Sequence, residues 1–250
     1  MLFGISPALQ EKAILIIKKK IRTVTTTFTI FLILPLLVYL LFLFNLVPEK
    51  AIVPDEIRAP VAVIHSAAGS GTAFLISPTI MLTSKEVVNG LKVGDQVDIS
   101  FDNAPNRPKV SGRIKYLSNQ TDRISKTGSS PDASASDVAV IEIDPISEIE
   151  PLVLGVSDLL QPADEVFILG FPGGQYSLTK GMINNTSYHG KSLFKIDAVS
   201  NSGNNGGPCI LRQDNTVIGI SVGGGDAQAE DTVIKINDVK LLLQNANINF

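Results

Sequence analysis

A series of short β-branched runs punctuated by glycine fills the chain from about residue 60 onward and most constrains its fold. Many short strands without alternating long helices are typical of an all-β barrel or sandwich. One helix is expected near the end, at 237–244, with Asn237 as its N-cap. The runs predict strands at 61–65, 72–76, 80–83, 96–101, 138–143, 165–169, 217–222 and 232–236.

An apolar run at 28–47 contains no Asp, Glu, Lys or Arg. About twenty such residues suffice to cross the hydrocarbon core of a bilayer as a helix. The run is longer than the apolar core of a cleaved signal peptide, and no small-x-small cleavage pattern follows it. We therefore expect one uncleaved transmembrane helix at 28–47, and a buried core helix is the less favoured alternative.

The charges on either side of this run predict its orientation. Five of the 21 basic residues and only one of the 24 acidic residues precede Pro48, and such an excess of positive charge normally stays in the cytoplasm. We expect a cytoplasmic basic segment at 1–27, a linker at 48–59 and a periplasmic or extracellular domain at 60–250. The part after the span carries a formal charge of −7, which argues against nucleic acid as a partner.

Four stretches of the domain contain, in this order, the motifs G-S-G-T-A-F, S-D-V-A-V-I, F-P-G-G and G-N-N-G-G-P. Together they resemble the HtrA-like branch of the trypsin-like serine proteases. The resemblance covers nearly all of 60–245. It implies two packed antiparallel six-stranded β-barrels with a C-terminal helix and the active site between the barrels. The four stretches are 69–90, 136–144, 168–174 and 197–208.

The resemblance also indicates where the catalytic triad would lie. Family members have T-x-x-H-V-V where this chain has T-S-K-E-V-V, so Glu86 occupies the position of the histidine base. Asp137 matches the aspartate, and Asn205 occupies the position of the nucleophilic serine. Acyl transfer of this type needs a hydroxyl or thiol nucleophile and a base that takes its proton. Because the chain retains only the carboxylate, we expect a catalytically inactive pseudoprotease.

An active serine endopeptidase is the alternative, with noncanonical or partner-supplied groups. The histidines of the chain, His65 and His189, lie away from the position of the base. Ser202 and Cys209 are each offset from the position of the nucleophile. None of these four residues is therefore expected to restore the chemistry.

The backbone of the site is expected to survive the substitutions. The turn of Gly203, Asn204 and Asn205 resembles an oxyanion hole, which depends on backbone N–H groups. The edge strand of trypsin-like proteases pairs with an extended peptide by β-augmentation, although a plain structural turn is an equal alternative here. The residues that match this edge are Ser221, Val222 and Gly223.

Glu86 and Asp137 are expected to lie close together, which requires a proton or a cation to relieve their repulsion. Two carboxylates are few ligands for a hard cation, so we expect no metal and no cofactor. The predicted function is that of a membrane-tethered binding or scaffold subunit. Its expected partners are a protein or extended peptide, an active protease paralogue or a membrane complex.

Overall fold

The computed structural model of the chain describes residues 11–12, 15–20, 22, 36, 39, 54–66, 69–119, 137–188, 192–198, 202–223 and 231–250. The chain divides into two units, Met1–Ile52 and Val53–Phe250. Within the described part of the first unit all residues are helical. No helix among the described residues is long and apolar enough to cross a membrane. The expected span at 28–47 lies outside the described residues, apart from Leu36 and Tyr39.

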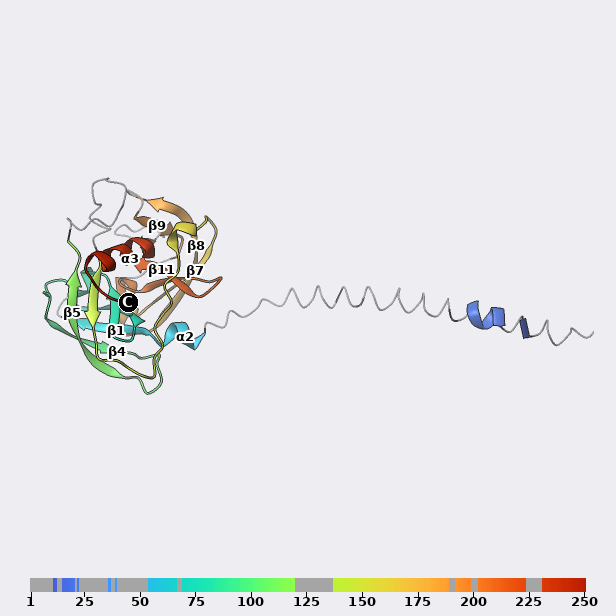
Figure 1. Ribbon diagram of the computed structural model, residues 1–250, viewed down its shortest axis with the longest axis horizontal. Coiled ribbons are helices and arrows are strands. Elements are labelled where there is room, and N and C mark those ends of the chain that lie inside the picture. The colour runs from blue at the N-terminus through green and yellow to red at the C-terminus, as the bar shows by residue number, and fades with distance from the viewer. Residues whose placement is uncertain are drawn as a thin grey trace, which may run out of the picture. The chain divides into compact units, whose positions relative to one another are not determined.

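The second unit contains two closed antiparallel barrels of six strands each (Figure 1). In the first barrel the strand order is β1-β2-β3-β6-β5-β4, and in the second it is β10-β11-β12-β9-β8-β7. The first six strands are β1 (Val61–Ser66), β2 (Gly69–Ser77), β3 (Ile80–Thr83), β4 (Gln96–Ser100), β5 (Lys109–Leu117) and β6 (Ala139–Glu142). The other six are β7 (Glu165–Gly170), β8 (Ser177–Tyr188), β9 (Leu193–Ile196), β10 (Pro208–Leu211), β11 (Thr216–Ser221) and β12 (Asp231–Lys235).

Strand β1 shows why the barrels pack together. Its side chains alternate between two apolar clusters: Ala62 and Ile64 belong to the interior of the first barrel, whereas Val61 and Val63 belong to the cluster between the barrels. Alternate residues of a strand point to opposite faces, so a strand buried on both faces needs a continuous apolar run. A third cluster fills the second barrel.

Two helices complete this unit. The helix α3 (Ile236–Asn245) contributes four buried apolar side chains to the cluster between the barrels. The short helix α2 (Asp55–Arg58) lies within the expected linker, but its Ile57 is 4% exposed and belongs to the same cluster. The last part of that linker is therefore packed against the fold rather than extended.

The predicted architecture of two six-stranded barrels and a C-terminal helix is confirmed. Each of the eight predicted runs overlaps a strand, although four of them extend one residue past one or both ends of the observed strand: 96–101, 138–143, 217–222 and 232–236. Strands β5, β8, β9 and β10 were missed. The prediction of Asn237 as the N-cap is wrong, because α3 begins one residue earlier after Lys235. Asn237 instead binds the segment before β7: its N–H donates to Ser157 Oγ, and its Oδ1 accepts the Ser157 N–H.

Asp238 in the first turn of α3 makes stability depend on pH. Burial raises the pKa of its carboxyl from 3.8 to about 6, against smaller opposing effects of Ser192 and Lys235. Between these values the folded chain binds more protons than the unfolded chain, so its free energy of unfolding falls as the pH rises. Between pH 4 and pH 7 the free energy of unfolding of the unsubstituted chain should fall by about 1–2 kcal/mol relative to that of Asp238→Asn, allowing for solvent screening.

Urea unfolding of both forms across this pH range measures the difference. The exposed carboxylate of Asp98 on β4 provides the control, because Asp98→Asn removes a charge outside α3. A constant difference between the Asp238→Asn form and the unsubstituted chain at all pH values would contradict the expectation.

Candidate functional site

Glu86 and Asp137 meet at one end of the first barrel. Glu86 begins the short helix η1 (Glu86–Val88) after β3, and Asp137 lies just before β6. Strands β3 and β6 are paired, with Thr83 opposite Ala139, so the two segments come together. The backbone N–H of Glu86 donates to Asp137 Oδ1 at 2.9 Å. Asp137 therefore holds the turn that presents Glu86.

The environment of Asp137 combines burial with two backbone donors. Burial raises the pKa of its carboxyl above the usual 3.8, and the nearby Glu86 carboxylate adds to the rise. Backbone N–H groups of Glu86 and Lys85, together with the Lys85 ammonium, act in the opposite direction. A carboxylate that binds two backbone N–H groups at the start of a helical turn stabilises that turn whether or not a catalytic base is present.

Thr72 on β2 fixes the turn that carries Asn205. Its N–H donates to the Asn205 carbonyl at 3.0 Å, and its Oγ1 donates to the Gly203 carbonyl at 2.7 Å. The same Oγ1 accepts the N–H of Phe171, next to the short helix η4 (Pro172–Gly174). Thr72 thus joins the first barrel to two segments of the second. It is fully buried.

The side chain of Asn205 reaches Glu86. Asn205 Nδ2 donates to Glu86 Oε2 at 3.1 Å, and the residue is only 9% exposed. Its Oδ1 has no hydrogen-bond partner in the described part of the chain, and a Cβ placed on Gly223 would lie 2.7 Å from it. Asn205, Glu86 and Asp137 are therefore brought together, as the sequence predicted. An amide nitrogen donates hydrogen bonds but neither attacks a carbonyl nor accepts a proton at neutral pH.

The backbone carbonyl groups of the turn formed by Gly203, Asn204 and Asn205 point into the protein interior. The Asn204 carbonyl accepts the Gly207 N–H at 2.8 Å, and no cis peptide occurs among the described residues. In a trans peptide the N–H points opposite to the preceding carbonyl, so the Asn205 N–H points away from Gly207. An oxyanion hole at Gly203, Asn204 and Asn205 stays a prediction. The Asn204 side chain is fully buried beside Gly170, with no hydrogen-bond partner among the described residues.

The predicted peptide-binding edge is partly occupied by the protein itself. Ser221 is buried; its N–H donates to the Gly207 carbonyl, and its carbonyl accepts the Gly206 N–H. Val222 donates to the opposite strand, β12, through the Thr232 carbonyl. Gly223, two residues beyond the end of β11, is therefore the first residue of this edge whose N–H has no partner among the described residues and is available to an added peptide.

One contact at this edge was not predicted from the sequence. Ser221 Oγ donates to Asp231 Oδ2 at 2.6 Å, and Asp231 is fully buried at the start of β12. Asp231 Oδ1 also accepts the N–H of Thr232. In the sequence, this carboxylate is marked only by its position directly before a predicted apolar strand. Surface aspartates often occupy the same position, so the burial of Asp231 could not be predicted.

The other candidate catalytic groups are not brought to the site among the described residues. Cys209 is fully buried in the second barrel, and burial raises the pKa of its thiol well above the usual range. His65 lies on β1, where its Nδ1 is 3.1 Å from Ser70 Oγ. His189 and the side chain of Ser202 lie outside the described residues.

Comparison with known proteins identifies the class of this fold and site. The trypsin-like peptidase domain matches residues 71–220. The chain belongs to the trypsin-like peptidase family.

Among curated proteins, serine protease HTRA1B of Danio rerio is 36% identical over 112 residues, which are 38% of this chain and 23% of that protein. Magnetosome formation protease MamE of Paramagnetospirillum magneticum is 35% identical over 95 residues, covering 35% and 13%. Human serine protease HTRA3 is 34% identical over 96 residues, covering 34% and 21%. The chain thus spans less than a quarter of the length of these relatives.

Among solved structures, the inactive form of the Rv3671c protease from M. tuberculosis matches with a TM-score of 0.58. The match covers 79% of this chain and 96% of that one at 23% identity, which supports the fold alone.

Thr72→Val should destabilise the protein while keeping the shape of the side chain. It removes the hydroxyl donor to the Gly203 carbonyl and one of two acceptors for the Phe171 N–H, which also donates to the Gly203 carbonyl at 3.3 Å. In this fully buried site the loss should cost about 1–3 kcal/mol. Thr179→Val on β8 is the control, because Thr179 is half-buried and its hydroxyl makes no hydrogen bond among the described residues. Urea unfolding measures both; equal midpoints for the two variants would contradict the role given to Thr72.

Proposed function

We propose that the chain is a trypsin-fold pseudoprotease that binds proteins or peptides without hydrolysing them. The contact between Asn205 Nδ2 and Glu86 Oε2 is the observation that carries the proposal. In a working site this contact would join a nucleophile to a general base. Here it joins an amide donor to a carboxylate acceptor, a stable pair with no proton to transfer.

Binding is proposed at the edge that ends in Gly223. An extended peptide adds to a sheet edge through backbone hydrogen bonds, which need no catalytic side chain. Gly223 has φ of 71° and continues from β11, whose main chain is anchored to the turn of Asn205. Binding and hydrolysis are therefore separable in this fold. Backbone groups would provide peptide binding, whereas hydrolysis would depend on the side chains at positions 86 and 205.

We further propose that the domain is tethered by a single membrane helix at 28–47 and faces the periplasm or the extracellular space. The uncharged run and the basic residues before it support this topology. A tethered, non-hydrolysing domain is suited to act as a scaffold subunit. The partner we propose is a protein or extended peptide, an active protease paralogue or a membrane complex.

The test is an activity measurement on the full chain purified in mild detergent, with casein as substrate and a fluorophosphonate as active-site label. We expect no casein turnover and no covalent label, because removing the triad nucleophile and base eliminates most of the rate enhancement. Repeating the assay with native membranes added tests for partner-supplied groups. Robust labelling that disappears when another serine is substituted would overturn the proposal in favour of an active endopeptidase.

A further inference from the structure

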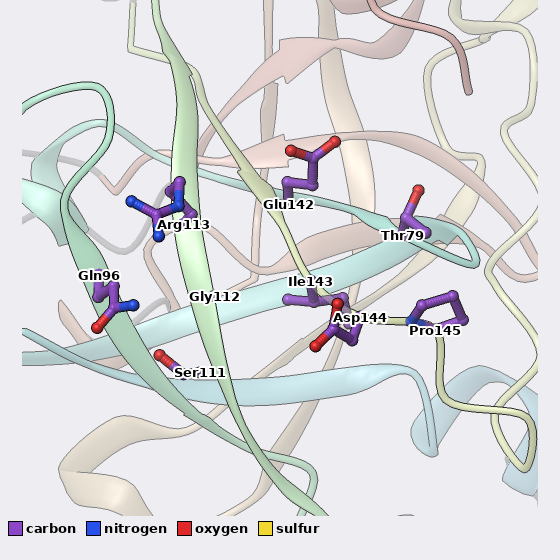
Figure 2. A pocket seen from close by; sticks show the side chains of 9 residues that line it. All are labelled: Thr79, Gln96, Ser111, Gly112, Arg113, Glu142, Ile143, Asp144 and Pro145. Atoms are coloured by element: carbon purple, nitrogen blue, oxygen red, sulfur yellow. The ribbon is translucent and has the colours of Figure 1, made fainter.

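A hollow of about 470 Å³ lies in the wall of the first barrel (Figure 2). Neither Glu86 nor Asn205 lines it. It forms where β5 and β6 separate. Their pairing ends with Arg113 opposite Glu142, although β5 continues to pair with β4 as far as Lys109. The chain after β6 turns away, because the Ile143 N–H donates to the Thr79 carbonyl. Pro145 has no N–H and ends any further pairing on this path.

Hydrogen-bond donors line one side of the hollow. Gln96, Ser111 and Arg113 lie on β4 and β5, as Figure 2 shows. Gln96 and Arg113 are direct cross-strand partners, and Ser111 is two residues from Arg113 on the same exposed face. One N–H of Arg113 donates to the Gly94 carbonyl at 2.7 Å. The side chains of Gln96 and Ser111 have no partner within the described ranges, so this side has donors available for an anion.

A carboxylate occupies the other side. Asp144 is exposed and makes no hydrogen bond or ion pair in the described portion of the chain. In Figure 2 its oxygen atoms turn toward the β5 side, whereas the Glu142 carboxylate points away. The Glu142 carboxylate already forms an ion pair with Lys115 on the neighbouring strand β5. The unpaired charges at the hollow are therefore one positive, on Arg113, and one negative, on Asp144.

This distribution selects against ions that carry a single charge. A free anion near Arg113 is repelled by Asp144, and a free cation near Asp144 is repelled by Arg113. A ligand with both charges satisfies both sides, with its carboxylate at the donors and its ammonium at Asp144. The volume is within the usual range for small-molecule sites, and the predominantly polar lining suits a compact, polar ligand.

We propose that this hollow binds a compact zwitterion, an α-amino acid or a short peptide. The site shares no residue with the Asn205 site, so it is independent of whether the chain hydrolyses or binds peptides there. The two sides come from different segments of one barrel, and Gly112 lies between them on β5. The backbone N–H of Gly112 is therefore a local reporter of occupancy.

The test is a titration of the isotopically labelled full chain in mild detergent, followed through the Gly112 amide resonance. Glycine and glycylglycine are the zwitterionic probes, and acetate and methylammonium carry one charge each. We expect saturable shifts with Kd at or below about 1 mM for at least one zwitterion, and at least about tenfold weaker binding of both single ions. Equal binding of acetate or methylammonium, or no saturable shift with any probe at about 10 mM, would overturn the proposal.

Two substitutions test the contributions of the two sides of the hollow separately. Asp144→Asn and Arg113→Gln should each weaken the tighter zwitterion at least about tenfold, because each removes one charge partner. Asp144 is exposed and forms no hydrogen bond or ion pair with any described residue, so its substitution should leave the fold intact. Glu150→Gln removes an exposed carboxylate that does not line the hollow and should leave Kd unchanged. Unchanged affinity in Asp144→Asn, or an equal loss in Glu150→Gln, would show that the site is not the one proposed.

Discussion

The hydrogen bonds of Thr72 are the constraint on which the rest of the site depends. From a fully buried position on β2, this one side chain binds the Gly203 carbonyl and the Phe171 N–H, while its backbone binds Asn205. Its own carbonyl accepts the hydroxyl of Thr83, at the end of the strand that leads to Glu86. A single residue of the first barrel therefore positions both halves of the site, and a change in its geometry would move Glu86 and Asn205 together.

Close packing around this residue explains which parts of a protease site the chain keeps. A Cβ on Gly203 would approach the Pro172 Cα to 2.2 Å, and one on Gly206 would approach Thr83 Oγ1 to 2.2 Å. Larger residues would displace backbone at both positions, so the glycines are required by the fold whatever the chemistry. Asp137 is retained for a similar reason, since it binds the backbone of η1. No comparable close packing fixes the side chains at 86 and 205, and these are the two that, in the function we propose, differ from a working triad.

The sequence allowed the architecture and the meeting of Glu86, Asp137 and Asn205 to be predicted, because glycine-punctuated apolar runs and ordered motifs are local signals. It did not allow prediction of β5, whose exposed face carries charged side chains around Gly112. Strand β8 is largely polar and β10 begins with a proline, so neither has the pattern of a buried strand. The contact of Thr72 with Gly203 joins residues 131 positions apart and depends on the packing of the two barrels, which no local pattern encodes.

In the function we propose, the protease framework is intact and hydrolysis is absent only because of the side chains at Glu86 and Asn205. The most direct test of this proposal is fluorophosphonate labelling of the double substitution Glu86→His and Asn205→Ser, with peptide mapping of the labelled position and each single substitution for comparison. We expect covalent labelling at position 205 in the double variant and none in the single variants. A correctly folded double variant that remains unlabelled would contradict it.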